Sequence, residues 1–427
     1  MHAQFPDSTT ANTLVIGGGQ AGLAMSYWLS NAGIEHRVFE RRSTLGGAWQ
    51  DRWDAFCLNT PNFSLQLPGM PYVGPSPEAF MSREDVVEHL RGYARAIGSP
   101  VDTDTDVTHV ALADGGFTVE TSNGVFDAQN VVLATGAYQK PKIPAVASSL
   151  PANIQQLHTN DYRNPGQLPD GAVLVVGTGQ SGGQIAEELH AAGRDVHLAV
   201  STCPEAPRRY RGRDLFYWLV QVGVHGSEYG VPPVGVDQLP SPEARFACNP
   251  LVSGAEGGHD IHLRSLGRRG VHLHGHLESF QRNELVFTDD LAERLTAVDS
   301  VFGQRMQPVI DAYIAAAGIN APPHEPRPLD EWVPDGPARL DVAEAGITSV
   351  IWATGFQFDF EFLDVPVLDP WNYPRHVRGV TEYDGLYALG LPWLTGQSSA
   401  LLTGVGRDAA YIAQHIAARH TADAGEH

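Results

Sequence analysis

Two glycine-rich turns, each between an apolar stretch and a helix-like stretch, are the residues of this chain best suited to chemistry. They are "GGGQAG" at 17–22 and "GTGQSG" at 177–182. In a G-x-G-x-x-G turn the first glycine permits a tight bend, the second lets the backbone approach a pyrophosphate, and the third lets the helix pack on the strand. The start of the helix offers unpaired N–H groups to the phosphates. Each turn is therefore predicted to bind a dinucleotide.

The two turns belong to one internal repeat with an offset of 160 residues. "TLVIG" aligns with "VLVVG", and the helix-ending Gly33 aligns with Gly193. Each copy reads as an apolar strand, the turn, an amphipathic helix and a second strand, which is half of a Rossmann unit. Because the chain has 45 glycines, one motif alone would be weak evidence, and the two copies in matching context are strong evidence.

The copies differ at the residue that ends the second strand. Glu40 is suited to accept hydrogen bonds from the ribose hydroxyls of an adenosine, whereas the same position in the second copy is Val200. A carboxylate would repel a 2′-phosphate, and a basic segment with Arg208 and Arg209 follows Val200. The second site is therefore predicted to take NADPH, with a solvated basic loop as the alternative.

These patterns predict an α/β protein with two Rossmann-like dinucleotide-binding domains, the second inserted into the first. The first domain is expected to be discontinuous, with residues 1–165 and 335–427, and the second to span 166–334. Residues of about 205–265 interrupt the second domain, and their aromatic "DLFYWLVQVG" is expected to be core or pocket wall rather than a membrane-surface helix.

Composition excludes several classes of partner. The net charge is −21 and there is no long basic run, which argues against nucleic acid and anionic membranes. No apolar run is long enough to span a membrane and no signal segment is evident, so a cytoplasmic protein is expected. The three cysteines are far apart in sequence, which argues against a disulfide framework or a dithiol centre.

A histidine stripe is assigned no metal. His272, His274 and His276 alternate along a predicted strand, and no acidic or cysteine partner is evident nearby in the sequence. Histidines in this arrangement are usually exposed or satisfied in the core. A homodimer is left open.

With "LGGAW" at 45–49, these features resemble the single-component FAD- and NADPH-dependent flavoprotein monooxygenases, the group of flavin-containing monooxygenases and plant auxin-forming enzymes. Within that group the chain is similar to the bacterial CzcO-like flavoproteins, over nearly its whole length. The resemblance implies FAD at the first turn and NADPH at the second. It also implies that O2 is used, through a flavin C4a-hydroperoxide, to oxygenate a small organic substrate at a nitrogen, sulfur or carbonyl centre.

The resemblance also assigns roles to particular residues. Asn59, followed by Pro61, matches a segment in which an asparagine lies beside the flavin and stabilises its oxygenated form, although asparagine also favours turns. His158 matches the histidine of a signature between the domains, or is a hydrogen-bonded structural residue. The predicted cofactor-binding residues are Gly17, Gly19, Gln20, Ala21, Gly22, Glu40, Arg41, Gly47, Trp49, Ala134, Thr135, Gly136, Gly177, Gly179, Gln180, Ser181, Gly182, Ser201, Arg208, Arg209, Ala353, Thr354 and Gly355.

Two other functions fit the same patterns. The chain could be an FAD-dependent NAD(P)H oxidoreductase that passes electrons to an acceptor other than oxygen. It could also be a non-catalytic module that binds NADPH and FAD and regulates another protein.

Overall fold

The repeat read from the sequence is present in the fold. A computed structural model describes residues 10–325 and 330–425. The first copy consists of β1 (Thr10–Ile16), α1 (Gln20–Asn31) and β2 (His36–Phe39), and the second of β11 (Ala172–Val176), α3 (Gln180–Ala191) and β12 (Val196–Ala199). In each copy the helix begins at the residue after the second glycine, where its N-terminus faces the turn. The two copies have the same helix length and the same strand spacing.

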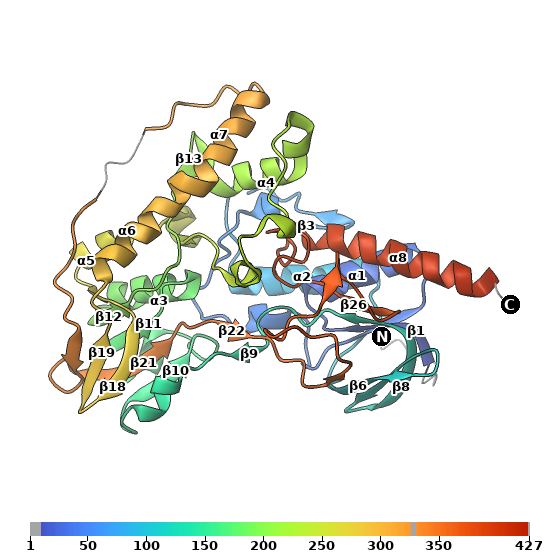
Figure 1. Cartoon of the computed structure of the whole chain (residues 1–427), viewed down its shortest axis with the longest axis horizontal. Coiled ribbons are helices and arrows are strands. Elements are labelled where there is room, and N and C mark those ends of the chain that lie inside the picture. Colours follow the sequence, from blue (N-terminus) through green and yellow to red (C-terminus); the bar gives the residue numbers. More distant parts are fainter. Residues whose placement is uncertain (1–9, 326–329, 426–427) are drawn as a thin grey trace.

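The first sheet joins the first copy to a β-meander and to the C-terminal part of the chain. β1 pairs in parallel with β2 on one side and with β8 on the other. β8 pairs in parallel with β26 and antiparallel with β7. The further strands of this sheet are β5 (Val101–Asp102), β6 (Val107–Ala113), β7 (Gly116–Thr121), β8 (Gly124–Leu133), β23 (Leu363–Asp364), β24 (His376–Val377), β25 (Val380–Thr381) and β26 (Leu386–Ala388). The long helix α8 (Val405–Gly425) packs beside α1, so the N-terminal and C-terminal parts of the chain lie together in this part of the fold (Figure 1).

The second sheet is parallel throughout. Its order is β10-β21-β11-β12-β17, and a smaller antiparallel sheet of β18, β19 and β20 lies beside it. The central strand β11 has the sequence AVLVV and every residue of it is buried, as expected where both faces of a parallel sheet are covered. The strands not yet bounded are β10 (Gln155–His158), β17 (His272–His274), β18 (Leu277–Gln281), β19 (Glu284–Phe287), β20 (Arg339–Asp341) and β21 (Ile347–Trp352).

Two histidines are buried in the second sheet. His197 in β12 and His274 in β17 are almost fully buried, and this burial lowers the pKa of each imidazole to about 4. Both rings are therefore neutral near pH 7.

The chain crosses twice between the two sheets, and the crossings pair with each other. β9 (Lys140–Pro141) and β22 (Phe356–Gln357) form a two-stranded ribbon between the two parts (Figure 1). Strands β10 and β21, which the predicted boundaries at 165 and 335 give to the first domain, pair in the second sheet, because a sequence pattern does not reveal which sheet a strand joins. We therefore propose that the second domain runs from about residue 142 to about residue 355.

The interrupting segment forms a helical layer over the second domain. α4 (Leu215–His225) begins at Asp214, whose side chain accepts a hydrogen bond from the backbone N–H of Phe216. Its apolar side chains pack on α7 (Gln307–Ala316), with Trp218 almost fully buried. The aromatic stretch is therefore core, which was one of its two expected roles.

The remaining elements are short or peripheral. α2 (Arg83–Ile97) is capped by Ser82, whose hydroxyl accepts from the backbone N–H of Asp85, and it ends at the left-handed Gly98. The others are α5 (Leu263–Arg268), α6 (Leu291–Val301), β3 (Gln66–Leu67), β4 (Met70–Pro71), β13 (Arg209–Tyr210), β14 (Arg213–Asp214), β15 (Val252–Ser253) and β16 (His259–Asp260).

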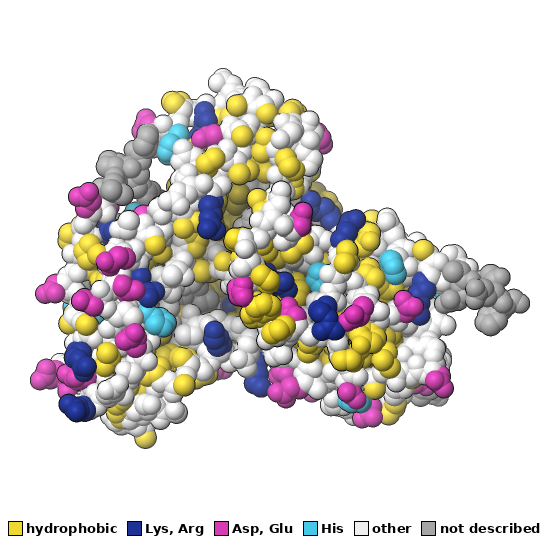
Figure 2. Space-filling view, viewed as in Figure 1, with side chains coloured by type: hydrophobic (Ala, Val, Ile, Leu, Met, Phe, Trp, Pro, Cys, Tyr) yellow, Lys and Arg dark blue, Asp and Glu magenta, His cyan; other side chains and the backbone are white. Residues whose placement is uncertain are grey.

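The surface mixes charges of both signs. On the face in Figure 2, Lys and Arg side chains alternate with Asp and Glu rather than forming a continuous basic track. The same face is hollowed between the parts built on the two sheets. Within residues 10–325 and 330–425, no helix combines the length and apolar character needed to cross a bilayer.

Two glycines of the second turn, Gly182 and Gly179, should respond differently to replacement by alanine. A Cβ at Gly182 would lie 1.9 Å from the carbonyl oxygen of Gly177, whereas one at Gly179 would meet nothing within 4 Å. Gly182→Ala should therefore cost about 3 kcal/mol of unfolding free energy, the upper end for overpacking. Gly179→Ala should cost at most about 1 kcal/mol, the difference between glycine and alanine as a helix N-cap. Urea denaturation followed by circular dichroism measures both, and equal stabilities would contradict the packing described here.

Candidate functional site

Each glycine turn lies at the carboxyl end of a parallel strand and is closed by a neighbouring strand end. Gly17 has a φ of +113°, and a Cβ there would lie 2.5 Å from the carbonyl oxygen of Ala134. A Cβ at Gly22 would lie 1.9 Å from the carbonyl oxygen of Gly17. These two glycines thus provide the tight bend and the close helix packing that the motif requires.

The second turn repeats this geometry. Gly177 has a φ of +104°, and a Cβ there would lie 2.6 Å from the carbonyl oxygen of Ala353. In both turns the alanine N–H donates to the strand that precedes the turn, from Ala134 to Ile16 and from Ala353 to Val176, each at 2.9 Å. Each Ala-Thr-Gly strand end is therefore in contact with one glycine turn. The next residues bond elsewhere: Thr135 accepts from Gln139, Thr354 donates to the carbonyl of Lys142, and Gly136 and Gly355 have positive φ.

The middle glycines face open space. A Cβ at Gly179 would meet nothing within 4 Å, and one at Gly19 would meet only the Cα of Gly47, at 4.0 Å. Gly47 faces Gly19 from the short helix Gly47–Asp51, so two residues without side chains line this gap. A pyrophosphate needs this kind of close approach to the backbone. The residues present therefore fit a dinucleotide at both turns.

In each turn, the glutamine that follows the middle glycine forms a hydrogen bond with a segment distant in sequence. The Nε2 of Gln20 donates to the carbonyl of Ala400 at 2.6 Å, and the Nε2 of Gln180 donates to the carbonyl of Pro250. The Nε1 of Trp49 donates to the Oε1 of Gln20 at 2.9 Å. The sequence analysis did not place the segments around residues 400 and 250 at these turns. The only sequence feature that pointed to them was the glutamine found at the same position in both copies of the repeat. Ala21 is buried and Ser181 is half-buried in the first helical turns.

Glu40 is held beside the first turn by backbone donors. Its carboxylate is almost fully buried and accepts from the N–H groups of Gly18 and Arg42, each at 3.0 Å. The predicted Arg41 is exposed, whereas the Arg42 guanidinium lies 3.9 Å from Glu40 and forms an ion pair with Asp51. The basic residue that supports this carboxylate is therefore Arg42, which sequence reasoning missed.

The second turn has hydroxyl groups where the first has a carboxylate. Val200 is fully buried, and Ser201 follows it. The N–H of Thr178 donates to the Ser201 hydroxyl at 3.1 Å, and the N–H of Ser201 donates to the Thr178 hydroxyl at 3.0 Å. This position of the second turn is therefore neutral and holds two hydroxyl groups.

Arg208 does not have the exposure that phosphate binding requires, which corrects the expectation for this residue. Its side chain is 3 % exposed, its Nε donates to Asp214 at 2.7 Å, and its Nη1 donates to the carbonyl of Asn59 at 2.6 Å. The guanidinium also lies over the ring of Phe80. The physical reason is the local hairpin of β13 and β14, which places Asp214 against Arg208. Arg209 is exposed, with its guanidinium 4.0 Å from Glu78.

Asn59 lies at the junction of the two domains. Its side-chain Oδ1 accepts from the Nε2 of Gln184 in α3 at 2.5 Å, and its carbonyl accepts from Arg208. The Nδ2 donor of Asn59 has no partner among the described residues. The Asn-Thr-Pro segment is thus fixed on both sides by the second domain.

A cavity of about 950 Å³ opens next to Gln184, between the Trp53–Cys57 segment, the outer side of α3 and residues 253–262. Its lining mixes polar and apolar side chains and includes Glu188 and His259. Burial raises the pKa of Glu188 to about 7, while Tyr162 donates a hydrogen bond to its carboxylate at 3.1 Å. This cavity touches neither glycine turn.

His158 is satisfied by the backbone at the domain junction. Its Nδ1 accepts from the N–H of Asn160 at 3.1 Å, so its Nε2 is the donor to the carbonyl of Gly355 at 2.9 Å. Burial lowers the pKa of this imidazole. His158 therefore orients the Gly355 strand end, which is the structural role considered for it.

Two cysteines that are distant in the sequence are neighbours in the fold. A hydrogen bond with the Cys248 thiol, together with burial, raises the pKa of the Cys203 thiol. Both thiols are free. The absence of a C-x-x-C motif did not exclude this pair, because the interrupting segment folds back on the end of β12.

Several known proteins are similar to this chain in sequence. Residues 14–220 match the family described as pyridine nucleotide-disulphide oxidoreductase. An uncharacterized CzcO-like oxidoreductase of Geobacillus kaustophilus is 32 % identical over 407 residues, which cover 95 % of this chain and 98 % of that protein. The probable indole-3-pyruvate monooxygenase YUCCA4 of Arabidopsis thaliana is 28 % identical over 207 residues, 48 % of this chain and 50 % of that protein.

A solved structure extends the likeness to the whole fold. The flavin-containing monooxygenase from Stenotrophomonas maltophilia superposes with a TM-score of 0.65 at 19 % identity, and the match covers 96 % of this chain and 99 % of that one. The two-sheet arrangement with its two glycine turns is therefore the fold of that protein. The chain belongs to the CzcO-like oxidoreductases.

Proposed function

We propose that this protein is an FAD-dependent monooxygenase that oxidises NADPH and transfers one atom of O2 to a small organic substrate. The observation that supports this most directly is the pair of glycine turns, each with an open middle glycine and each closed by an Ala-Thr-Gly strand end. Two such turns suit two dinucleotides, and the proteins that this chain resembles in sequence and in fold include monooxygenases. The substrate centre is a nitrogen, a sulfur or a carbonyl group.

The first turn is proposed to hold FAD. Gly19 and Gly47 leave the gap for the pyrophosphate, and the buried Glu40 carboxylate is placed to accept from ribose hydroxyls. The flavin would supply two-electron reduction and reaction with O2. Trp49 and Gln20, joined by a hydrogen bond, close the turn on the side of the Ala400 segment.

The second turn is proposed to hold NADPH. The positions that follow β12 are neutral, so no carboxylate repels a 2′-phosphate. Thr178 is fully buried and its hydroxyl pairs with that of Ser201, so the half-buried Ser201 hydroxyl is the one placed to donate to the phosphate oxygens. Arg209 is the exposed cation that follows, whereas Arg208 serves the domain junction.

Asn59 is proposed to act between the two nucleotides. The Gln184 hydrogen bond fixes the amide plane of Asn59, which leaves its Nδ2 as a donor of defined direction. An amide can donate to a developing negative charge without changing its own protonation state. The role of Asn59 is thus to orient and stabilise, and that of Gln184 is to position Asn59.

Replacement of Gly19 by leucine should give a folded protein without flavin. The side chain would enter the gap that Gly47 lines, where the structure has space but FAD would need it. The purified variant should lack the flavin absorbance near 450 nm while keeping the circular dichroism of the wild type. Gly223→Leu is the control, because Gly223 lies within α4, has no positive φ and has nothing within 4 Å of its Cβ position. Full flavin content in Gly19→Leu would contradict the assignment of FAD to this turn.

Replacement of Asn59 by leucine should uncouple NADPH oxidation from product formation. The change removes the donor and the acceptor at similar size, so flavin binding and reduction should persist. Loss of one donor at analogous oxyanion sites costs about 2.7–4 kcal/mol, so product should fall about a hundredfold or more while hydrogen peroxide rises. The assay measures NADPH, peroxide and product together, with ¹⁸O2 to trace the oxygen. Gln184→Leu should show a smaller shift in the same direction.

The same assay on the wild type tests the proposed reaction itself. Product with one ¹⁸O atom per NADPH supports a monooxygenase. NADPH oxidation that occurs only with a quinone or protein acceptor would instead indicate a reductase. Tight NADPH binding without turnover on any substrate would indicate a regulatory module.

A negative charge at residue 201 should weaken the preference for NADPH over NADH. Ser201→Asp would place a carboxylate beside the turn, and juxtaposed like charges cost enough to change affinity tenfold, about 1.4 kcal/mol, or more. The ratio of kcat/KM for NADPH to that for NADH should fall at least about tenfold in Ser201→Asp. Ser201→Asn, which is neutral and of the same size, is the matched control and should change the ratio much less. An unchanged ratio in both variants would place the 2′-phosphate elsewhere.

A further inference from the structure

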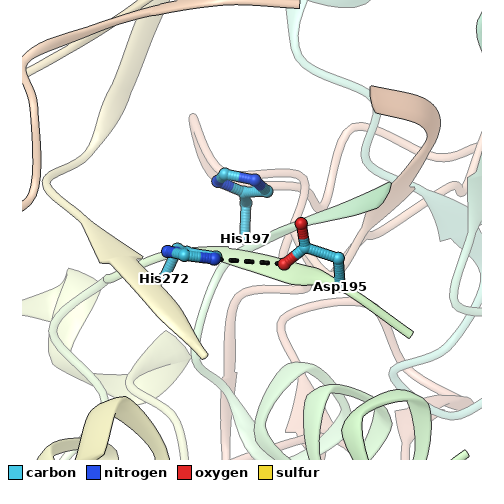
Figure 3. Close-up of side chains that lie close together, drawn as sticks. All are labelled: Asp195, His197 and His272. Carbon is cyan, nitrogen blue, oxygen red and sulfur yellow. Dashed lines mark ion pairs between the residues drawn. The ribbon is translucent and has the colours of Figure 1, made fainter. Parts of the chain in front are cut away.

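Three side chains that can bind a metal lie together at the edge of the second sheet, away from the glycine turns. Asp195 precedes β12, His197 lies within it, and His272 begins the edge strand β17 (Figure 3). One carboxylate oxygen and one nitrogen of each imidazole lie within 4.8 Å of one another. The histidine stripe therefore has an acidic partner, which comes from another strand and was not visible in the local sequence.

The backbone fixes the relative positions of these groups. His197 and His272 are register partners in the parallel pair of β12 and β17. Their rings stack with centroids 4.7 Å apart and an interplanar angle of 22°. The carboxylate of Asp195 lies 3.1 Å from the Nε2 of His272 (Figure 3). Two strands from distant parts of the chain thus present their ligand groups side by side.

A second observation concerns the nitrogen of His197 that remains available. The Nδ1 of His197 lies 3.0 Å from the Nε2 of His274, and the Nδ1 of His274 lies 3.4 Å from the carbonyl of Pro337. Because a carbonyl oxygen only accepts, His274 has its proton on Nδ1 and accepts at Nε2. His197 must then donate from Nδ1, which leaves its Nε2 with a lone pair.

This Nε2 has no partner among the described residues, although His197 is only 5 % exposed. A histidine that binds a metal usually donates its other ring N–H to an acceptor, which fixes the tautomer and the ring orientation. His274 provides this acceptor for His197, and it is itself stacked on Phe287 at 4.5 Å. The buried part of the cluster is therefore organised as the support of a metal ligand.

We propose that Asp195, His197 and His272 form a binding site for a divalent transition metal such as Zn²⁺. Two imidazoles and one carboxylate suit zinc and its neighbours in the series, with a water as a fourth ligand. Bonds of about 2.0–2.2 Å place the ligands of one tetrahedral ion about 3.3–3.5 Å apart. Because the lone pairs of two stacked rings do not converge, the His272 ring must turn out of its stack with His197 to share one ion. Asp195 and His272 have exposed side chains, so both can rotate in this way.

The site is separate from the proposed redox centre. Its residues lie toward the amino ends of β12 and β17, whereas the glycine turn lies at the carboxyl end of the sheet. A bound ion would cross-link two segments far apart in sequence and so stabilise the second domain. The inference does not depend on the proposed function, and a metal-binding readout tests it without any turnover.

The test compares three variants of the full chain after removal of metals with EDTA. His272→Ala and Asp195→Asn each remove one exposed ligand. His276→Ala removes an exposed histidine from the same segment outside the cluster. Isothermal titration with ZnCl2 gives the stoichiometry and the Kd, and the visible absorbance of added Co²⁺ reports tetrahedral coordination. Circular dichroism confirms that each variant is folded.

The wild type should bind one Zn²⁺ with saturation, and its melting temperature should rise with zinc concentration. His272→Ala and Asp195→Asn should weaken the Kd at least about tenfold and lose the tetrahedral Co²⁺ spectrum. His276→Ala should bind as the wild type does. The proposal is overturned if the wild type shows no saturable binding. It is also overturned if the ligand variants bind as tightly as His276→Ala.

Discussion

The shape of both glycine turns depends on one backbone contact, made twice. The first glycine of each turn lies beneath the carbonyl of an alanine that ends a neighbouring strand, Ala134 over Gly17 and Ala353 over Gly177. A side chain at either glycine would overlap that carbonyl, and the positive φ of both residues also favours glycine. The contact lets the chain reverse within a few residues, so the helix N-terminus and the neighbouring strand end meet at one point. The open middle glycine is a consequence of this reversal.

The two glycine turns thus share one backbone conformation, and they differ in the side chains that surround them. At the first turn, the buried Glu40 carboxylate is held by two backbone N–H groups. At the second, Val200 removes the charge and the Thr178 and Ser201 hydroxyls pair across the turn. Because the backbone around both turns is alike, the exchange of Glu40 for Val200 gives the two turns different charges on the same framework.

The sequence predicted what depends on local spacing and missed what depends on tertiary partners. The repeat, the two Rossmann-like units and the start of α1 and α3 follow from glycine spacing and apolar runs, because these are fixed by neighbouring residues. The sheet that β21 joins is decided by a long-range pairing, which its apolar sequence does not encode. In the same way, the neighbours of Cys203 and His272 come from segments that only the folded chain brings near. Local acidity could not reveal Asp195 as a partner of His272, because the two lie on different strands.

Arg208 shows how contacts with residues distant in sequence can give a residue a different role from the one its local sequence predicts. In the sequence it is one of several arginines after β12, and exposure would suit it to a phosphate. In the fold it forms a buried ion pair with Asp214 and donates to the carbonyl of Asn59 in the first domain. A buried ion pair is costly to break, because the remaining charge has no compensation, by about 3–5 kcal/mol. With the bond from Gln184 to the Asn59 side chain, it fixes the first-domain segment against α3, the helix that leaves the second turn. Arg208 therefore links the Asn59 segment to the second domain through buried contacts, without lying in either glycine turn.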